Sequence, residues 1–108
     1  MELRVYHKIN KIKELIEIDN SIIFVGGIAK YFMGNKDLEN VKELDFVIKN
    51  INKLNTKYDL ILLPKVKPIE ERAYCISDNI QLDIFIREIN EPIFTTIIDG
   101  IEIKHTAE

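Results

Sequence analysis

The chain has 108 residues and a single cysteine, which favours one domain and excludes an internal disulfide. Apolar residues make up 46% and charged residues 31%, a balance typical of a globular protein rather than a disordered one. The net charge is −3 with scattered basic residues, so we expect no strong nucleic-acid patch. No signal peptide is evident, and no apolar run approaches the roughly 20 residues of a membrane span. We therefore expect a cytoplasmic protein without a membrane partner.

Hydrophobic periodicity predicts a mixture of helices and strands. Ile9, Ile12 and Ile16 recur at helical spacing near the N-terminus, whereas later apolar runs are short, β-branched or alternating. The predicted elements are a helix over residues 4–18, a strand over 22–25, a helix over 28–33, a strand over 43–48, a short helix or turn over 51–56, a strand over 58–63, a loop over 65–71, and strands over 72–77, 80–86, 93–98 and 101–104. The fold class expected is α/β (α+β): one domain over residues 1–108, with a mixed β-sheet, an N-terminal helix and a second helix after a glycine turn.

Small and polar residues mark the ends of these elements. The double glycine at 26–27 ends the first strand, and Gly34 closes the second helix as a C-cap. Asp-Asn at 78–79 and Asp-Gly at 99–100 predict tight turns, because Asn and Gly tolerate a positive φ. The second half of the chain is thus expected to contain two hairpins.

Two of the predicted strands carry carboxylates. Glu43 and Asp45 are two residues apart, so both side chains leave the same face of their strand, about 7 Å apart along it. Asp83 lies between Leu82 and Ile84, where a charge is costly without compensation. For either strand alone, an acid that faces water from a half-exposed sheet is the simpler interpretation. Both strands together favour a shared site for Mg²⁺ or Mn²⁺, since oxygen ligands suit these ions.

The glycine turn is a candidate phosphate seat. Glycine lets a ligand approach the backbone closely, and the start of a helix supplies N–H groups and a partial positive charge. An ordinary tight turn at residues 26–27 is the alternative. Lys30, one turn into the helix, is a candidate phosphate ligand, with a solvated lysine as the alternative. Cys75 is expected to be buried, and His7 and His105 are assigned no role.

Three segments in this order resemble the DNA polymerase β-type nucleotidyltransferase superfamily. They are Val25-Gly26-Gly27-Ile28-Ala29, Glu43-Leu44-Asp45-Phe46-Val47 and Leu82-Asp83-Ile84-Phe85. The superfamily pattern is a Gly-Gly or Gly-Ser turn, an acid–x–acid strand and a third carboxylate on a neighbouring strand. Within it, the chain is most similar to abortive-infection (AbiE-type) toxin nucleotidyltransferases and to minimal nucleotidyltransferase antitoxins. The resemblance runs from about Ser21 to the C-terminus and includes the final strand pair.

The resemblance implies a function and a role for each of these residues. Gly26 and Gly27 would hold the phosphates of a nucleoside triphosphate (NTP). Glu43, Asp45 and Asp83 would be metal ligands and catalytic carboxylates, with Asp83 helping to activate the acceptor hydroxyl. The implied activity is the Mg²⁺- or Mn²⁺-dependent transfer of a nucleotide from an NTP to an unknown acceptor, which is RNA, protein or a small molecule.

Two positions depart from the superfamily pattern: Glu43 stands where Asp is commoner, and Gly27 stands where Ser is frequent. Larger relatives also carry C-terminal helices that this sequence does not contain. The alternative function is therefore a catalytically weak or inactive nucleotidyltransferase-fold binding module, such as an antitoxin or a partner subunit. An unrelated small α/β domain is a third possibility. Consecutive apolar residues, such as those at 60–63, predict a homodimer or a second protein chain bound through the sheet face or the terminal hairpin.

Overall fold

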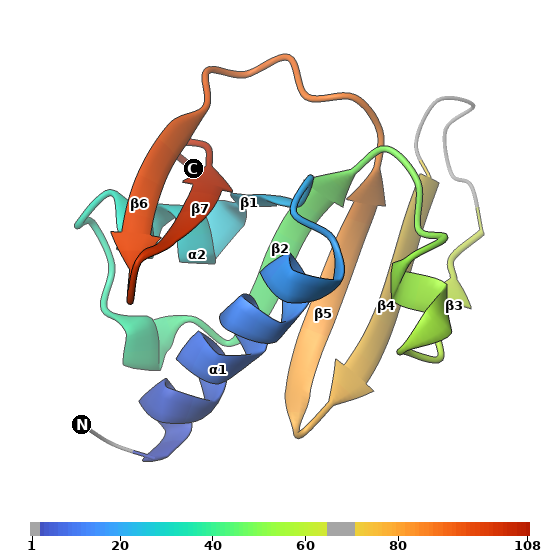
Figure 1. Ribbon diagram of the computed structural model, residues 1–108, viewed down its shortest axis with the longest axis horizontal. Coiled ribbons are helices and arrows are strands. Elements are labelled where there is room, and N and C mark those ends of the chain that lie inside the picture. The colour runs from blue at the N-terminus through green and yellow to red at the C-terminus, as the bar shows by residue number, and fades with distance from the viewer. Residues whose placement is uncertain (1–2, 65–70) are drawn as a thin grey trace.

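The computed structural model describes residues 3–64 and 71–108 (Figure 1). Within these residues the α-helices are α1 (Leu3–Ile18) and α2 (Gly26–Phe32), with short 3₁₀ helices η1 (Leu38–Asn40) and η2 (Leu54–Thr56). The strands are β1 (Ile23–Val25), β2 (Glu43–Ile48), β3 (Ile61–Leu62), β4 (Glu71–Ser77), β5 (Ile80–Ile86), β6 (Phe94–Ile98) and β7 (Ile101–His105). The loop predicted over residues 65–71 lies outside the described residues, apart from Glu71, which begins β4.

The seven strands of the described residues form one mixed sheet in the order β3-β4-β5-β2-β1-β7-β6. β2 pairs with β5, and β1 with β7, in parallel. The remaining neighbours are antiparallel. The N-terminal helix, the second helix and the mixed sheet confirm the predicted α+β class. The second helix begins at Gly26 and not after the two glycines, as the predicted range 28–33 had it. In this order β2 and β5 lie side by side at the centre of the sheet, although they are distant in sequence.

Alternation along the central strands separates the two faces of the sheet. One face carries buried apolar residues, including Leu44, Phe46 and Leu82, and it packs on the apolar side of α1. Figure 1 shows α1 lying across β2 and β5. Burying each such side chain stabilises the fold by about 1.5–3 kcal/mol. The opposite face carries the charged members of the same strands, among them Glu43 and Asp45.

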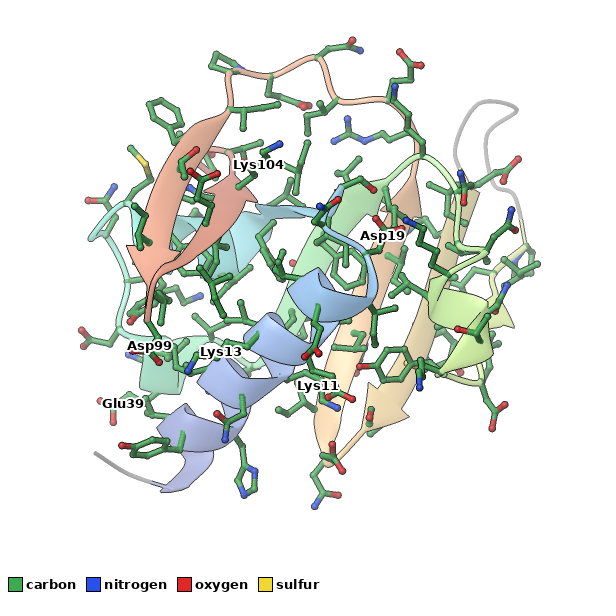
Figure 2. The ribbon with its side chains drawn as sticks, viewed as in Figure 1. Lys11, Lys13, Asp19, Glu39, Asp99 and Lys104 are labelled. Atoms are coloured by element: carbon green, nitrogen blue, oxygen red, sulfur yellow. The ribbon has the colours of Figure 1, made fainter. Side chains whose placement is uncertain are left out.

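Helix α1 is tied to both hairpin turns by two lysines, which Figure 2 labels together with Asp99. The Lys11 Nζ donates hydrogen bonds to Asp78 Oδ2 at 2.7 Å and to Ser77 Oγ at 2.9 Å, in the turn between β4 and β5. Lys13 pairs with Asp99 in the turn between β6 and β7. The Lys11 side chain is almost fully buried and the Lys13 side chain is partly exposed. One helix therefore contacts both hairpins.

Both hairpin turns have the backbone expected of them. The φ angles are 54° at Asp78 and 63° at Asn79, and 52° at Asp99 and 78° at Gly100. Two successive positive φ values are typical of the type I′ turn that joins two strands by two residues. The hairpins predicted from Asp-Asn and Asp-Gly are thus confirmed.

The strand predicted over residues 58–63 is wrong in extent. Only Ile61–Leu62 form a strand, and both of these side chains are more than half exposed. Tyr58 is instead the end of a helical turn, because its N–H donates to the Leu54 carbonyl at 2.9 Å. Its ring is buried beneath Lys11, with the ammonium 5.3 Å from the ring centroid. Burial under α1 therefore determines the conformation of a segment whose composition is typical of a strand.

Candidate metal centre

Three carboxylates converge on the face of the sheet opposite α1. The parallel register of β2 and β5 places Asp45 opposite Asp83, and Glu43 lies two residues before Asp45 on the same face. One carboxylate oxygen from each residue lies within 4.8 Å of the others. The structure thus brings together the three acids singled out in the sequence, and neighbouring strands are the reason that they meet.

The glycine turn adjoins this cluster. β1 pairs with β2 so that Val25 lies opposite Asp45, which places the next residue, Gly26, against the Asp45 carboxylate. A Cβ on Gly26 would lie 2.4 Å from Asp45 Oδ2, and Gly26 has a φ of +66°. Position 26 therefore needs glycine both for its backbone conformation and for space. Gly27, by contrast, has no positive φ.

The electrostatics of the cluster favour the uptake of positive charge. Burial, followed by the charges of Glu43 and Asp83, raises the pKa of Asp45 to about 7. Burial and a hydrogen bond with Asp83 also raise the pKa of Glu43. Arg72 opposes both shifts, and its guanidinium lies 4.7 Å from the Phe85 ring centroid on the same sheet face. One arginine offsets three clustered carboxylates only in part.

The donor set and its spacing fit a hard divalent cation. Mg²⁺ binds oxygen at about 2.1 Å, so two ligands on opposite sides of the ion lie about 4.2 Å apart. The observed limit of 4.8 Å exceeds that span by a few tenths of an ångström, which small side-chain rotations can close. Glu43, Asp45 and Asp83 are half-buried, so the cluster is open to solvent on one side. Three protein ligands leave coordination positions for a substrate.

A small cavity adjoins the carboxylates. Its volume is about 250 Å³, and its lining residues are Gly27, Lys36, Asn40, Val41, Lys42, Glu43 and Asp45. This volume is below the roughly 300–1,000 Å³ typical of drug-sized ligands and suits a phosphate group better than a whole nucleotide. Two lysines, Lys36 and Lys42, and two acidic residues, Glu43 and Asp45, line the cavity. Such a lining suits a metal-bound phosphate.

Lys36 is the basic residue nearest to the glycine turn in this cavity. Its Nζ lies 3.3 Å from the position that a Cβ on Gly27 would take. Lys30, the candidate from the sequence, is exposed on α2 and is not among the residues that line the cavity. Sequence reasoning missed Lys36 and Lys42, and the signal that could have found them is the polar connector between the second helix and the acidic strand.

Cys75, His7 and His105, which were also considered in the sequence, lie away from the candidate site. Cys75 is buried, and burial raises its pKa, which is typical of an unreactive thiol. His105 is also buried, with Nε2 at 2.7 Å from Thr96 Oγ1 and Nδ1 at 2.8 Å from the Thr106 carbonyl. His7 is exposed. These residues lie outside the lining of the cavity beside the acids.

Comparisons with protein-family models, with curated proteins and with solved structures gave no match to this chain. Within residues 3–64 and 71–108, no helix has the length and apolar character needed to cross a membrane. The geometry of the carboxylate cluster and of its cavity is therefore the basis on which a function is inferred.

Proposed function

We propose that this protein is a metal-dependent nucleotidyltransferase that moves a nucleotide from an NTP to an acceptor. The observation that carries this proposal is the convergence of Glu43, Asp45 and Asp83 beside a glycine turn and a lysine-lined cavity. The resemblance of the three segments that contain these residues to the polymerase β-type superfamily agrees with it. Nucleotidyl transfer requires this combination, because the substrate carries several negative charges that must be held beside a metal.

Each group of the site has a role in the proposed reaction. Glu43, Asp45 and Asp83 would hold Mg²⁺ or Mn²⁺, which when bound would neutralise charge on the α-phosphate. Lys36 and the open backbone at Gly27 would hold the outer phosphates in the cavity. Asp83, on the neighbouring strand, would accept the proton of the attacking acceptor hydroxyl. The contribution of the protein is thus mainly positioning and charge compensation.

A second candidate function is a nucleotidyltransferase-fold binding module without turnover, such as an antitoxin or a partner subunit. Exposed apolar side chains favour it, because Ile61, Leu62 and Ile76, on the neighbouring strands β3 and β4, are each more than half exposed. Such residues indicate contact with another protein when they gather on one surface. This candidate predicts partner binding that survives the loss of the carboxylates.

Nucleotide binding and turnover test the proposal directly. Calorimetry with Mn²⁺ and a non-hydrolysable ATP analogue should show binding by the wild-type protein. Lys36→Ala should weaken that binding about tenfold, equivalent to roughly 1.4 kcal/mol for a lost charge-assisted contact. Lys30→Ala, the matched control on exposed α2, should leave the affinity unchanged. Transfer from radiolabelled NTPs to cellular RNA or protein should occur with wild type and stop with Asp83→Asn.

The outcomes separate the two functions. Binding of the analogue without any transfer supports the binding module. Absence of metal-dependent nucleotide binding in the folded wild-type protein contradicts the nucleotidyltransferase, and the carboxylates are then acids on an exposed sheet face. The binding module has its own test, which is partner binding that survives the loss of the carboxylates. Equal affinities for Lys36→Ala and Lys30→Ala would remove the cavity from the proposal.

A further inference from the structure

The two edges of the sheet differ in length and in protection. β3, at one edge, has two residues, and a short edge strand offers little backbone to another chain. β6, at the other edge, has five residues with the sequence Phe-Thr-Thr-Ile-Ile. It contains no charge and no proline, the residues with which proteins commonly guard an open edge. β6 is therefore the longer and less protected of the two edges, and Figure 1 shows it beside β7.

The hairpin register identifies the backbone groups that β6 offers. In a two-residue hairpin the residues that flank the turn form a hydrogen-bonded pair, and the pairs then alternate along the ladder. Ile98 and Ile101 flank the turn, and Thr96 pairs with Ile103. Counting from the turn, Ile98, Thr96 and Phe94 bond inward to β7. The N–H and C=O groups of Thr95 and Ile97 consequently point away from the sheet.

Apolar side chains gather along the same edge. Phe94 is 42% exposed, Ile97 65%, and Ile93, immediately before the strand, 46%. Thr95 is exposed between them. Pairing with another strand would stabilise β6 in two ways. The outward backbone groups would form hydrogen bonds, and the exposed apolar side chains would be buried.

We infer that β6 pairs antiparallel with β6 of a second copy of this chain, about a two-fold axis at Thr96. In this register Thr95 of each copy lies opposite Ile97 of the other, so the outward backbone groups meet. Phe94 of each copy lies beside Ile98 of the other on the opposite face. A register centred on Thr96 keeps all five residues of both strands paired, and any shift leaves some of them unpaired.

The self-complementarity of the edge is the reason for choosing a second copy as the occupant. A two-fold interface uses the same surface of both copies. In this register each residue of β6 lies opposite a residue of β6 in the other copy. β6 has no charged residue, so two copies of this strand can approach each other without repulsion between edge charges. Five-residue strands bury less than a standard interface, and we therefore expect a reversible dimer whose population depends on concentration. The joined sheet would be continuous across both copies.

Sedimentation velocity over a concentration series tests this pairing. Wild type should pass from monomer to dimer between micromolar and high micromolar concentration. Ile97→Lys places a charge at the edge and should keep the protein monomeric throughout. Ile76→Lys is the matched control, because Ile76 on β4 is 67% exposed, close to the 65% of Ile97, but lies near the opposite end of the sheet from β6. This control should dimerise like wild type.

Crosslinking tests the register. Two Thr96→Cys copies would face each other in a non-hydrogen-bonded pair with Cα atoms about 4.5 Å apart, which a disulfide can span. Two Thr95→Cys copies would be offset by two residues, with Cα atoms roughly 8 Å apart, beyond that reach. Mild oxidation should therefore link Thr96→Cys dimers and leave Thr95→Cys unlinked. Thr96→Cys loses a hydrogen bond to His105, so its melting temperature is measured first, and Ile97→Lys decides if it does not fold.

Three results would overturn the inference. Wild type that stays monomeric over the series has no such edge contact. A dimer that Ile97→Lys leaves intact uses another surface. A dimer that Ile76→Lys also dissociates is formed through the sheet face. None of these results bears on nucleotide binding, so the dimer and the proposed function are tested separately.

Discussion

Gly26 illustrates how one residue joins the fold to the candidate site. Its φ of +66° falls in the region that glycine adopts most readily, and its missing Cβ leaves the room that Asp45 Oδ2 occupies. Glycine at this position thus allows β1 to turn into α2 while the carboxylate stays in the cluster. A side chain here would affect both the backbone and the position of the Asp45 carboxylate.

Gly26→Ala should therefore abolish most of the stabilisation by Mn²⁺. The matched control is Gly34→Ala, since Gly34 has a φ of +81° but a Cβ there would meet no atom of the described residues within 4 Å. Both variants should lose about 1–2 kcal/mol of unfolding free energy through the left-handed backbone. Thermal denaturation with and without Mn²⁺ measures the difference. An equal rise in melting temperature for the two variants would show that Asp45 is not a ligand.

Asp45 should also make the metal-free protein sensitive to pH. Its pKa rises from 3.8 to about 7 on folding, so the folded state binds a proton that the unfolded state releases. Stability is therefore highest at low pH with respect to this group and declines as pH rises from about 4 to 7. The full shift corresponds to about 4 kcal/mol, which solvent screening of a half-exposed carboxyl reduces to roughly 1–2 kcal/mol.

Asp45→Asn should accordingly be more stable than wild type at pH 8 in the presence of a chelator. The difference should vanish near pH 4, and saturating Mn²⁺ should reverse it, because only wild type would gain from the ion. Urea unfolding at several pH values gives the required free energies. A variant less stable than wild type at pH 8 without metal would contradict a strained carboxylate cluster.

At the scale of elements, strands with regular alternation were predictable and irregular segments were not. β2 has the predicted bounds, 43–48, because buried and half-buried residues alternate at its start. The Asp-Asn and Asp-Gly dipeptides located both hairpins. β3 was overpredicted because the apolar run at 60–63 has no alternation that indicates a face. Lys36 was missed because its place beside Gly27 depends on the path of an irregular connector.

The contact of α1 with the two hairpins provides a test at this scale. Lys11→Met keeps the buried stem and removes the hydrogen bonds to Ser77, Asp78 and Glu14. It should lower the unfolding free energy by about 1–3 kcal/mol, the range for hydrogen bonds to charged groups. Lys13→Met, which removes the partly exposed pair with Asp99, should cost less than about 1 kcal/mol. Urea unfolding at neutral pH compares them.

The loss of unfolding free energy caused by Lys11→Met should become smaller in acid. The hydrogen bond with Lys11 holds the pKa of Asp78 below its ordinary value of 3.8, so the contribution of this pair is present above that pH and is lost as pH falls through the lowered pKa. If Lys11→Met and Lys13→Met lowered the unfolding free energy equally at neutral pH, the buried Lys11 would have no special role.

At the scale of the whole molecule, the candidate site and the open edge lie on different parts of the sheet. The carboxylates occupy β2 and β5, whereas β6 lies beyond β1 and β7. Three strand spacings separate β2 from β6, roughly 14 Å. Pairing at the edge would thus leave the candidate metal centre and its cavity accessible. The proposed catalysis and the proposed self-association should therefore respond independently to substitution.

The two lysine contacts of α1 also set an order for folding during synthesis. Lys11 bonds to Asp78, 67 residues later, and Lys13 to Asp99, 86 residues later. β1 likewise pairs with β7, where Phe24 lies opposite His105. Helix α1 precedes these docking partners in the chain, so it is synthesised before them. Because such long-range closures are slow, α1 would dock completely only after both hairpins have been made, and until then part of its apolar side would be open to a chaperone.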